Sequence, residues 1–230
     1  MLELYTARSP VVFKVLIALE EMGFSFGSIP LDVTKGEQYS ESFAAINPNG
    51  RIPALVDHAP ADGGSPIALA ESGAILVYLA EKTGQFLPTA ARQRAEVLQW
   101  VFWQMASLGP TMGQTRHFLL FARERCPYAI ERFSHEAARL YDVLDKRMTG
   151  RDYVCGDYSI ADMACWPWLL YSKSNGLDLD TYAHVARWFR QVASRPAVER
   201  VAHTWWNGLP IESAMPLDRE AQRILFGWKD

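Results

Sequence analysis

The sequence predicts an α/β domain followed by an all-α domain, and two observations support this division. Up to residue 83, short strand-like segments bounded by turn residues alternate with helical patterns. From Thr89 onward, apolar residues recur at the three- and four-residue spacing of amphipathic helices. We therefore predict a first domain over 1–83, a linker over 84–88, an all-helical domain over 89–205 and an irregular tail over 206–230.

The first domain supplies its elements in the order β-α-β-α-β-β-α. The predicted segments are a strand over 2–6, a helix over 12–22, a strand over 26–31, a short helix over 40–46, strands over 52–58 and 66–69, and a helix over 73–82. A helix between the first two strands makes those strands parallel. The loop from Asp62 to Ser65 is rich in turn residues and predicts a hairpin between the last two strands. This order is the thioredoxin-like arrangement.

The second domain is predicted to consist of helices alone. The expected helices cover 90–108, 111–124, 128–148, 163–170 and 182–194. Gly109-Pro110 is expected to end the first of them. Ser159 and Asp162 have the spacing of a capping box at the start of the apolar helix, which gives Asp162 a structural role. Beyond Trp205 the periodicity is lost, and Pro210 and Pro216 interrupt the chain.

Composition excludes several classes of function. With 230 residues, 49% hydrophobic residues and a net charge of -3, the chain gives no reason to expect nucleic acid or an anionic membrane surface. No apolar run approaches the ~20 residues of a membrane helix. The sequence opens on a strand, so no signal peptide is expected. The three cysteines, Cys126, Cys155 and Cys165, have no C-x-x-C spacing, which favours a reducing cytoplasm. The five histidines lack metal-site spacing, so no metal is expected.

The segment from Asn47 to Ser72 has the features of a peptide-binding edge. Asn47-Pro48-Asn49-Gly50 is dense in turn formers. Pro53 belongs at the first residue of a strand, and a cis Ile52–Pro53 bond would turn the N–H and C=O of Ile52 outward. Ser72 is expected as the N-cap of the next helix, whose free N–H groups suit a carboxylate. An exposed backbone edge beside a carboxylate site is suited to a short peptide.

These residues resemble the glutathione site of the cytosolic glutathione transferases. Ile52-Pro53-Ala54-Leu55, followed after a hairpin by Glu71-Ser72-Gly73-Ala74-Ile75, carries the resemblance, which extends over roughly residues 1–205. It implies a cis Pro53, an Ile52 backbone paired with the cysteinyl part of glutathione, and a Glu71-Ser72 pair that holds the γ-glutamyl end. It also implies a homodimer and a buried Ser159–Asp162 helix.

Further segments narrow the resemblance to the nu-class, Ure2-like bacterial transferases. They include His58-Ala59-Pro60-Ala61-Asp62-Gly63-Gly64, Pro127-Tyr128-Ala129-Ile130-Glu131-Arg132 and the run from Ser159 to Trp168. Members of that group resemble disulfide-bond reductases that bind two glutathiones or glutathione disulfide. The resemblance implies that the first glutathione is bound by Gln38, Arg51, Ile52, Pro53, Glu71 and Ser72, and that Arg132 reaches the site across a dimer. Arg132 is alternatively a solvated helix charge.

A glutathione enzyme must stabilise a thiolate, because a free thiol titrates near ~8.5. Ser9 precedes the helix that begins near Val12, where its hydroxyl and the free N–H groups of the helix would both serve as donors to sulfur. Ser9 is alternatively the N-cap of that helix only. Tyr5 is the rival donor, although a strand tyrosine more often packs in the core.

One departure from the family pattern concerns the same loop. The family commonly has Thr-Pro-Asn-Gly where this chain has Ser9-Pro10-Val11-Val12, so the side-chain donor of the asparagine is replaced by Val11. This puts disulfide reduction in question more than glutathione binding. The preferred function is glutathione-dependent reduction of disulfides through a Ser9-stabilised thiolate. The alternatives are glutathione conjugation to an apolar electrophile and a non-catalytic glutathione-binding carrier or regulator. The sequence does not identify the second substrate.

Overall fold

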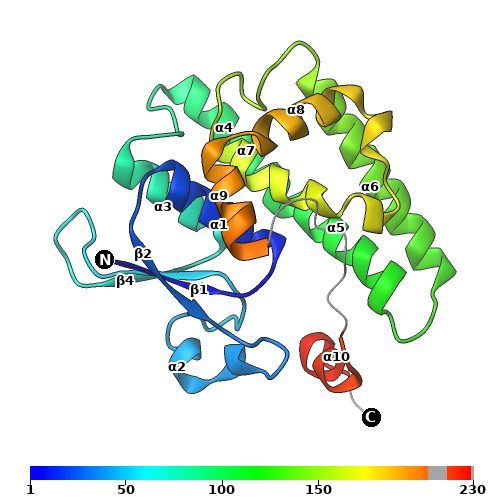
Figure 1. Cartoon of the computed structure of the whole chain (residues 1–230), viewed down its shortest axis with the longest axis horizontal. Helices are drawn as coiled ribbons and strands as arrows, with labels where there is room; N and C mark the ends of the chain where they lie inside the picture. Colours follow the sequence, from blue (N-terminus) through cyan, green and yellow to red (C-terminus); the bar gives the residue numbers. More distant parts are fainter. Residues whose placement is uncertain (207–216, 229–230) are drawn as a thin grey trace. The chain divides into compact units, whose positions relative to one another are not determined.

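The computed structural model describes residues 1–206 and 217–228, which fall into two compact units. The first unit comprises Met1–Thr83 and the C-terminal segment that carries helix α10. The second unit begins at Gly84 and, within the described residues, extends to Trp206. Figure 1 shows the elements of both units along the chain. Among the described residues, no helix has the length and apolar character needed to cross a membrane.

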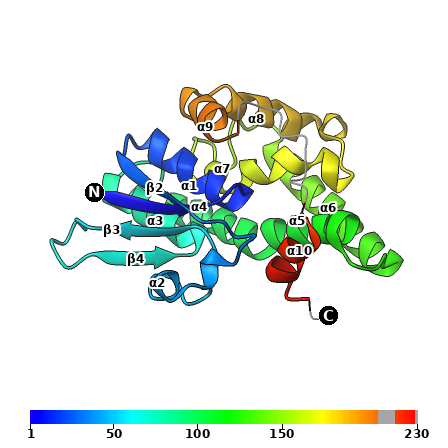
Figure 2. The same cartoon turned by 60° about the horizontal axis from the view of Figure 1, so that its bottom comes forward.

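The first unit is built on a four-stranded mixed sheet in the order β2-β1-β3-β4. Its elements are β1 (Leu2–Thr6), α1 (Pro10–Glu21), β2 (Phe26–Pro30), the 3₁₀ turn η1 (Glu37–Tyr39), α2 (Glu41–Ala44), β3 (Ala54–Asp57), β4 (Ile67–Ala70) and α3 (Ser72–Thr83). Strand β1 runs parallel to β2 and antiparallel to β3, and β3 runs antiparallel to β4. Helices α1 and α3 lie on one face of the sheet and α2 on the other (Figures 1 and 2). The predicted thioredoxin-like arrangement is confirmed.

Helix α1 is held in the first unit by apolar burial. Every residue of α1 from Val12 to Leu19 is buried, and α1 packs directly on α3. Burial of this kind is worth about 25 cal/mol per Å² of apolar surface. The helix that follows the Ser9 loop is therefore one of the best-buried segments of the unit, and its N-terminus has a fixed position.

Helix α3 begins one residue earlier than predicted. Ser72 was expected as the N-cap, but it is the first helical residue, and the carbonyl of Glu71 accepts the first helical bond from the Ile75 N–H at 3.0 Å. Glu71 adopts a left-handed backbone conformation with φ of 66°, which is uncommon for a residue with a side chain. This conformation reverses the chain direction between β4 and α3, so Glu71 takes the place of the cap.

The second unit consists of helical elements. They are α4 (Ala91–Trp103), the π-helical segment η2 (Gln104–Leu108), α5 (Gly109–Arg116), the π-helical segment η3 (His117–Phe121), α6 (Pro127–Met148), α7 (Ile160–Cys165), the 3₁₀ segments η4 (Trp166–Tyr171), η5 (Lys173–Asn175) and η6 (Leu179–Thr181), α8 (Ala183–Ala193) and α9 (Pro196–Trp206). The all-α character of this unit is confirmed.

The expectation that Gly109-Pro110 ends a helix is wrong. Helical backbone continues from α4 through η2 into α5, because the Gly109 N–H donates to the Gln104 carbonyl in a wide, π-type turn just before Pro110. A Cβ on Gly109 would lie 3.2 Å from Trp168 Cζ2, so the glycine allows close packing here instead of a helix end.

The capping box at the start of α7 is confirmed. The Ser159 N–H donates to Asp162 Oδ2 at 3.0 Å, and the Ala161 N–H donates to Ser159 Oγ at 3.3 Å. Asp162 is fully buried and also accepts from the Val154 N–H and from Trp188 Nε1, at 2.9 and 2.8 Å. One carboxylate therefore joins the loop before α7 to α8.

The prediction of an irregular tail over 206–230 is wrong where the chain forms helix α10. Residues 207–216 and 229–230 lie outside the described part of the chain, but Arg219–Phe226 form helix α10. Asp218 caps this helix by accepting from the Ala221 N–H at 2.7 Å. Both prolines of the tail precede this cap, so neither interrupts the helix. Within the first unit, Ile224 lies against Gly36, where an added Cβ would be 3.6 Å from Ile224 Cγ2.

Candidate functional site

Strand register places three predicted site segments at one edge of the sheet. Tyr5 pairs with Ala54, and Ala54 pairs with Ala70. The end of β1, the start of β3 and the end of β4 therefore lie side by side. The loop to Ser9 leaves this edge after β1, Ile52–Pro53 enters it before β3, and Glu71–Ser72 follows it after β4.

The turn before β3 presents the backbone of Ile52. The Ile52–Pro53 peptide bond is cis, as the resemblance implied. Asn47 is buried, accepts from the Asn49 N–H at 3.0 Å and donates through Nδ2 to the Arg51 carbonyl at 2.5 Å. These bonds hold the chain up to Ile52. No hydrogen bond joins the backbone of Ile52 to another described residue, so its N–H and C=O are available to a bound peptide.

Ser9 is the N-cap of α1. Its Oγ accepts from the Val11 N–H at 3.3 Å, while its carbonyl accepts from the N–H groups of Val12 and Phe13, each at 3.1 Å. Pro10, the first helical residue, has no N–H. The first-turn amides expected to point at sulfur are therefore already engaged. The hydroxyl hydrogen of Ser9 has no acceptor among the described residues, so it remains the donor of this loop.

Tyr5 packs against Phe43, with the two ring centroids 5.4 Å apart and the rings tilted by 52°. Aromatic pairs of this geometry are a normal part of a hydrophobic core. This contact favours the packing interpretation of Tyr5 over the role of rival donor.

Gln38 is a buried amide with one unused acceptor. The side chain is 2% exposed, and its Nε2 donates to the Val33 carbonyl at 3.2 Å. Its Oε1 has no partner among the described residues. The Gln38 carbonyl lies 3.4 Å from the position a Cβ would occupy on Gly50, whose φ is 61°. Gln38 is thus next to the turn that leads to Arg51 and Ile52, and its Oε1 suits a ligand N–H or ammonium.

The start of α3 offers an anion site that a buried lysine supports. Ser72 is 1% exposed and lies at the positive end of the helix dipole. Lys14, also 1% exposed, comes from α1, and its Nζ lies 3.3 Å from Ser72 Oγ. An ammonium group only donates, so Ser72 Oγ is the acceptor and its own hydrogen points elsewhere. Both the charge of Lys14 and the orientation of the hydroxyl favour a carboxylate at this helix end.

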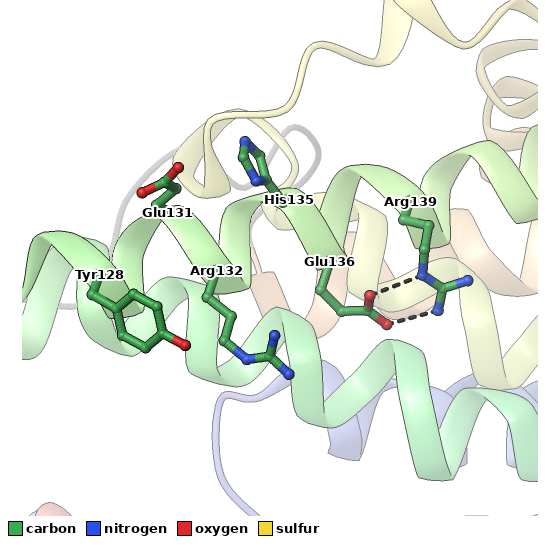
Figure 3. Close-up of a pocket in the computed structure, with 6 residues that line it drawn as sticks. All are labelled: Tyr128, Glu131, Arg132, His135, Glu136 and Arg139. Atoms are coloured by element: carbon green, nitrogen blue, oxygen red, sulfur yellow. Dashed lines mark hydrogen bonds and ion pairs between the residues drawn. The ribbon is translucent and has the colours of Figure 1, made fainter.

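Arg51 and Arg132 are both exposed, and neither guanidinium makes a hydrogen bond to another described residue. Arg51 belongs to the first unit, beside Ile52. Arg132 belongs to the second unit and lies in an open depression along α6, which is lined by Tyr128, Glu131, Arg132, His135, Glu136 and Arg139. Figure 3 shows Tyr128, Arg132 and Glu136 projecting from one side of α6.

The neighbours of Arg132 in this depression already include an ion pair. Arg139 donates to both oxygens of Glu136, at 2.8 and 2.7 Å (Figure 3). This hydrogen-bonded pair, with a smaller contribution from the charge of Arg132, holds the pKa of Glu136 below its usual range. Glu136 therefore pairs with Arg139, and the guanidinium of Arg132 is accessible to solvent or to a ligand.

The first unit contains no cysteine. The cysteines Cys126, Cys155 and Cys165 are all free and all belong to the second unit. Burial raises the pKa of the Cys155 thiol to about 12, so it stays protonated at neutral pH. Within the described residues, no group of His, Cys, Asp and Glu side chains has the arrangement of a metal site.

Sequence reasoning missed two supporting residues. Lys14 lies among apolar positions of α1. A single charged residue within this apolar run was the sequence feature that could have indicated its role. Asn47 was identified as a turn former, but its side-chain bond to the Arg51 carbonyl depends on the folded turn. Both act on atoms next to predicted ligand positions.

Two family models match the chain. The model described as glutathione S-transferase, N-terminal domain, matches residues 1–81, and the model described as glutathione S-transferase, C-terminal domain, matches residues 112–196. A similar relative is a protein of Escherichia coli named disulfide-bond oxidoreductase YfcG. It is 49% identical over 198 residues, covering 86% of this chain and 92% of that protein.

Solved structures agree with this likeness. A glutathione transferase from Pseudomonas putida, described with one glutathione disulfide bound per subunit, is 38% identical with a TM-score of 0.82, covering 86% of this chain and 89% of that one. A glutathione transferase from Burkholderia graminis, described with two glutathione molecules bound per subunit, is 37% identical with a TM-score of 0.84, covering 90% of this chain and 89% of that one.

Proposed function

Because the chain belongs to the glutathione S-transferase family, we propose that it is a glutathione-dependent enzyme that reduces disulfides. The observation that carries this proposal is the meeting of Ser9, Ile52 and Ser72 at one sheet edge, with the Ile52 backbone unpaired within the described chain. The likeness to a disulfide-bond oxidoreductase, and to transferases that hold glutathione or its disulfide, supports the choice of reaction.

Glutathione would lie along this edge as a short extended peptide. The N–H and C=O of Ile52 would pair with its cysteinyl residue, next to cis-Pro53. Its γ-glutamyl carboxylate would accept from the N-terminus of α3 and from the Ser72 hydroxyl, with Lys14 behind them. The unused Oε1 of Gln38 would accept from a glutathione N–H or ammonium. Arg51 and Glu71, both exposed, would bind its charged ends.

Ser9 would then act on the sulfur as a donor. Its hydroxyl is too weak an acid to be deprotonated first, but its free hydrogen can bond to the thiolate and favour the charged form. Each unit by which the thiol pKa falls corresponds to about 1.4 kcal/mol. Because the amides of the first turn of α1 are engaged, the thiolate would be stabilised by the Ser9 hydroxyl and the dipole of α1.

The reaction is a pair of thiol–disulfide exchanges. The bound glutathione thiolate attacks one sulfur of the substrate disulfide, forms a mixed disulfide and releases the other half as a thiolate, which takes a proton from water. A second glutathione thiolate attacks the glutathione sulfur of the mixed disulfide and releases the second half. Two glutathiones are thereby oxidised to one glutathione disulfide, and the substrate is reduced to two thiols.

The test is turnover of 2-hydroxyethyl disulfide by the parent protein, Ser9→Ala and Ser9→Thr. Loss of one hydrogen bond to a charged group predicts roughly a 10- to 100-fold lower kcat for Ser9→Ala, with glutathione affinity within about threefold of the parent. Ser9→Thr keeps both the hydroxyl and the cap and should retain most activity. Absence of turnover in the parent would contradict the proposed reaction, and equal turnover in Ser9→Ala would contradict the role of Ser9.

A second candidate is conjugation of glutathione to an apolar electrophile. Val11 favours it, because an apolar residue next to Ser9 replaces a polar donor and lies on the half-exposed first turn of α1. A screen of electrophiles against the parent protein separates the two reactions. Glutathione binding without turnover of either substrate would support a non-catalytic carrier or regulator instead.

The site is also proposed to require a homodimer. Arg132 is exposed on α6, its guanidinium makes no hydrogen bond or ion pair within the described residues, and the family resemblance has it reach glutathione in the other subunit. Sedimentation of the parent protein tests the oligomeric state, and a monomeric parent would contradict the proposed homodimer. The glutathione affinity of Arg132→Gln tests the role of Arg132. A cytoplasmic location fits three free cysteines and a thiol co-substrate.

A further inference from the structure

Arg116 is a half-buried guanidinium at the end of α5 whose position is fixed from three directions. Its Nη1 donates to Ser174 Oγ at 2.5 Å. Ser174 in turn donates to the Tyr171 carbonyl at 3.0 Å, so the direction of both bonds is determined. The guanidinium carbon lies 4.3 Å from the centroid of the Tyr171 ring and 5.8 Å from that of Phe121. All four residues belong to the second unit.

No carboxylate neutralises this charge within the described chain. Arg139, Arg147 and Arg223 each pair with a glutamate, whereas Arg116 forms no ion pair with any residue that the structure describes. Burial lowers the pKa of Arg116, and Tyr171 opposes that shift. A cation taken partly out of water without an anion is unusual, because buried charges are normally paired. The two aromatic rings compensate in part.

The hydrogen-bonding edge of the guanidinium is also unused. With Nη1 engaged by Ser174, the Nε–H and Nη2–H groups donate to no described residue. These two groups are parallel donors that match the two oxygens of a carboxylate. The fixed side chain would lose little conformational entropy when it binds such a group.

We propose that Arg116 binds the carboxylate of a small organic ligand, in a site formed by Arg116, Ser174, Tyr171 and Phe121. Tyr171 and Phe121 supply an apolar surface beside the charge, which suits a carboxylate attached to a hydrocarbon chain or ring. Two sources share this chemistry. The carboxylate belongs to the disulfide substrate, a reading that rests on the proposed function, or it belongs to a separate ligand that is not turned over.

Calorimetry without glutathione tests the site itself. The probes are 3,3′-dithiodipropionate, a disulfide with two carboxylates, and its dimethyl ester, which has the same skeleton and no charge. The parent should bind the diacid and bind the ester at least tenfold more weakly. This comparison needs no variant, so it stands even if changes at Arg116 impair folding. Equal affinity for the two probes, or no binding of the diacid, would overturn the proposal.

Variants then locate the binding. Arg116→Gln should weaken binding of the diacid at least tenfold. Arg116→Lys should bind the diacid with an affinity between those of the parent and Arg116→Gln, because lysine keeps the charge but lacks the paired donors. Arg190→Gln is the matched control, since it removes an exposed arginine from α8 of the same unit and should leave affinity unchanged. Equal weakening by Arg190→Gln would show that only the net charge matters and would overturn the assignment to Arg116.

Turnover identifies the source of the carboxylate. If Arg116→Gln raises the KM for 3,3′-dithiodipropionate at least tenfold but not that for 2-hydroxyethyl disulfide, the ligand is the substrate. If both KM values stay unchanged while diacid binding is lost, the ligand is a separate molecule. If the parent reduces neither disulfide, the proposed function fails, but the calorimetric comparison still decides whether Arg116 is a carboxylate site.

Discussion

Lys14 Nζ lies 3.3 Å from Ser72 Oγ, and this contact joins the helix capped by Ser9 to the helix that would bind the carboxylate of glutathione. Both side chains are 1% exposed. Since the lysine can only donate, the serine hydrogen is directed to another acceptor. If glutathione binds as proposed, Lys14 would therefore affect it through Ser72, without touching the ligand.

Replacing Lys14 by methionine should weaken glutathione binding about tenfold. Methionine fills a similar volume but removes the charge behind α3 and the bond that orients the Ser72 hydroxyl. Calorimetric titration of glutathione into the parent and Lys14→Met measures the change. Lys35→Met is the control: its amine is on the surface of the same unit, 3.0 Å from Asp32, with a side chain 76% exposed, and affinity should not change.

A ligand analogue separates positioning from folding. Glutathione amidated at the γ-glutamyl α-carboxylate has no charge for Lys14 to favour, so the parent and Lys14→Met should bind it with equal affinity. If Lys14→Met weakens the analogue as much as glutathione, the lysine supports the fold of the edge and has no specific effect on the carboxylate.

Val11→Asn should increase disulfide turnover. Ser9 is the donor that remains in this loop, because the first-turn amides of α1 are engaged. An asparagine at the half-exposed position 11 adds a side-chain donor at the start of the helix, and one such bond to a thiolate predicts roughly a tenfold higher kcat. Val11→Leu adds no donor and should leave kcat unchanged. A rise in both variants would point to altered packing, and no rise in Val11→Asn would mean that position 11 does not face the sulfur.

The sheet edge of the site was predictable because its signals are local. A turn of Asn47 to Gly50, a proline at the start of a strand and a serine before a helical pattern are each short-range features. The order of the elements makes these strands neighbours, whereas the register that aligns the three segments is given by the structure. The role of Lys14 was not predictable, because its partner Ser72 is 58 residues away. A single charge in an apolar helix does not indicate which residue it will contact.

The fold departed from expectation where tertiary contacts override local rules. Gly109-Pro110 normally ends a helix, but here a π-type turn and close packing against Trp168 carry the chain through. Glu71 holds a left-handed conformation that residue type alone would not suggest. The Ser159–Asp162 capping box, by contrast, is specified within four residues and was predicted correctly.

Removing all three cysteines should leave disulfide turnover within about twofold of the parent. The proposed chemistry uses glutathione sulfur alone, and Cys155 is a poor nucleophile because burial raises its pKa to about 12. The variant combines Cys126→Ser, Cys155→Ser and Cys165→Ala, the last chosen because that side chain is buried. Circular dichroism confirms folding before turnover of 2-hydroxyethyl disulfide is measured. Loss of turnover in the folded variant would place a protein thiol in the reaction.

The stability contribution of Asp162 should depend on pH with a definite sign. Burial raises the pKa of Asp162 to about 6, although hydrogen bonds from Val154, Trp188 and Ser159 oppose the shift. In the unfolded chain an aspartate titrates near ~3.9. Between these values the folded state binds a proton that the unfolded state does not. The contribution is therefore fully present below pH ~4 and is lost as pH rises through about 6.

Comparison with Asp162→Asn isolates this contribution from the other titrating groups. The free energy of unfolding of the parent, relative to that of the variant, should increase by about 1.4 kcal/mol per pH unit as pH falls from 6 towards 4. At neutral pH the variant should be less stable by about 1–3 kcal/mol, because an amide NH₂ would face donors that the carboxylate now satisfies. Denaturant unfolding of both proteins at several pH values measures the difference. If the parent instead loses stability relative to Asp162→Asn as pH falls, the hydrogen bonds outweigh burial, and the carboxylate stays charged in the folded protein.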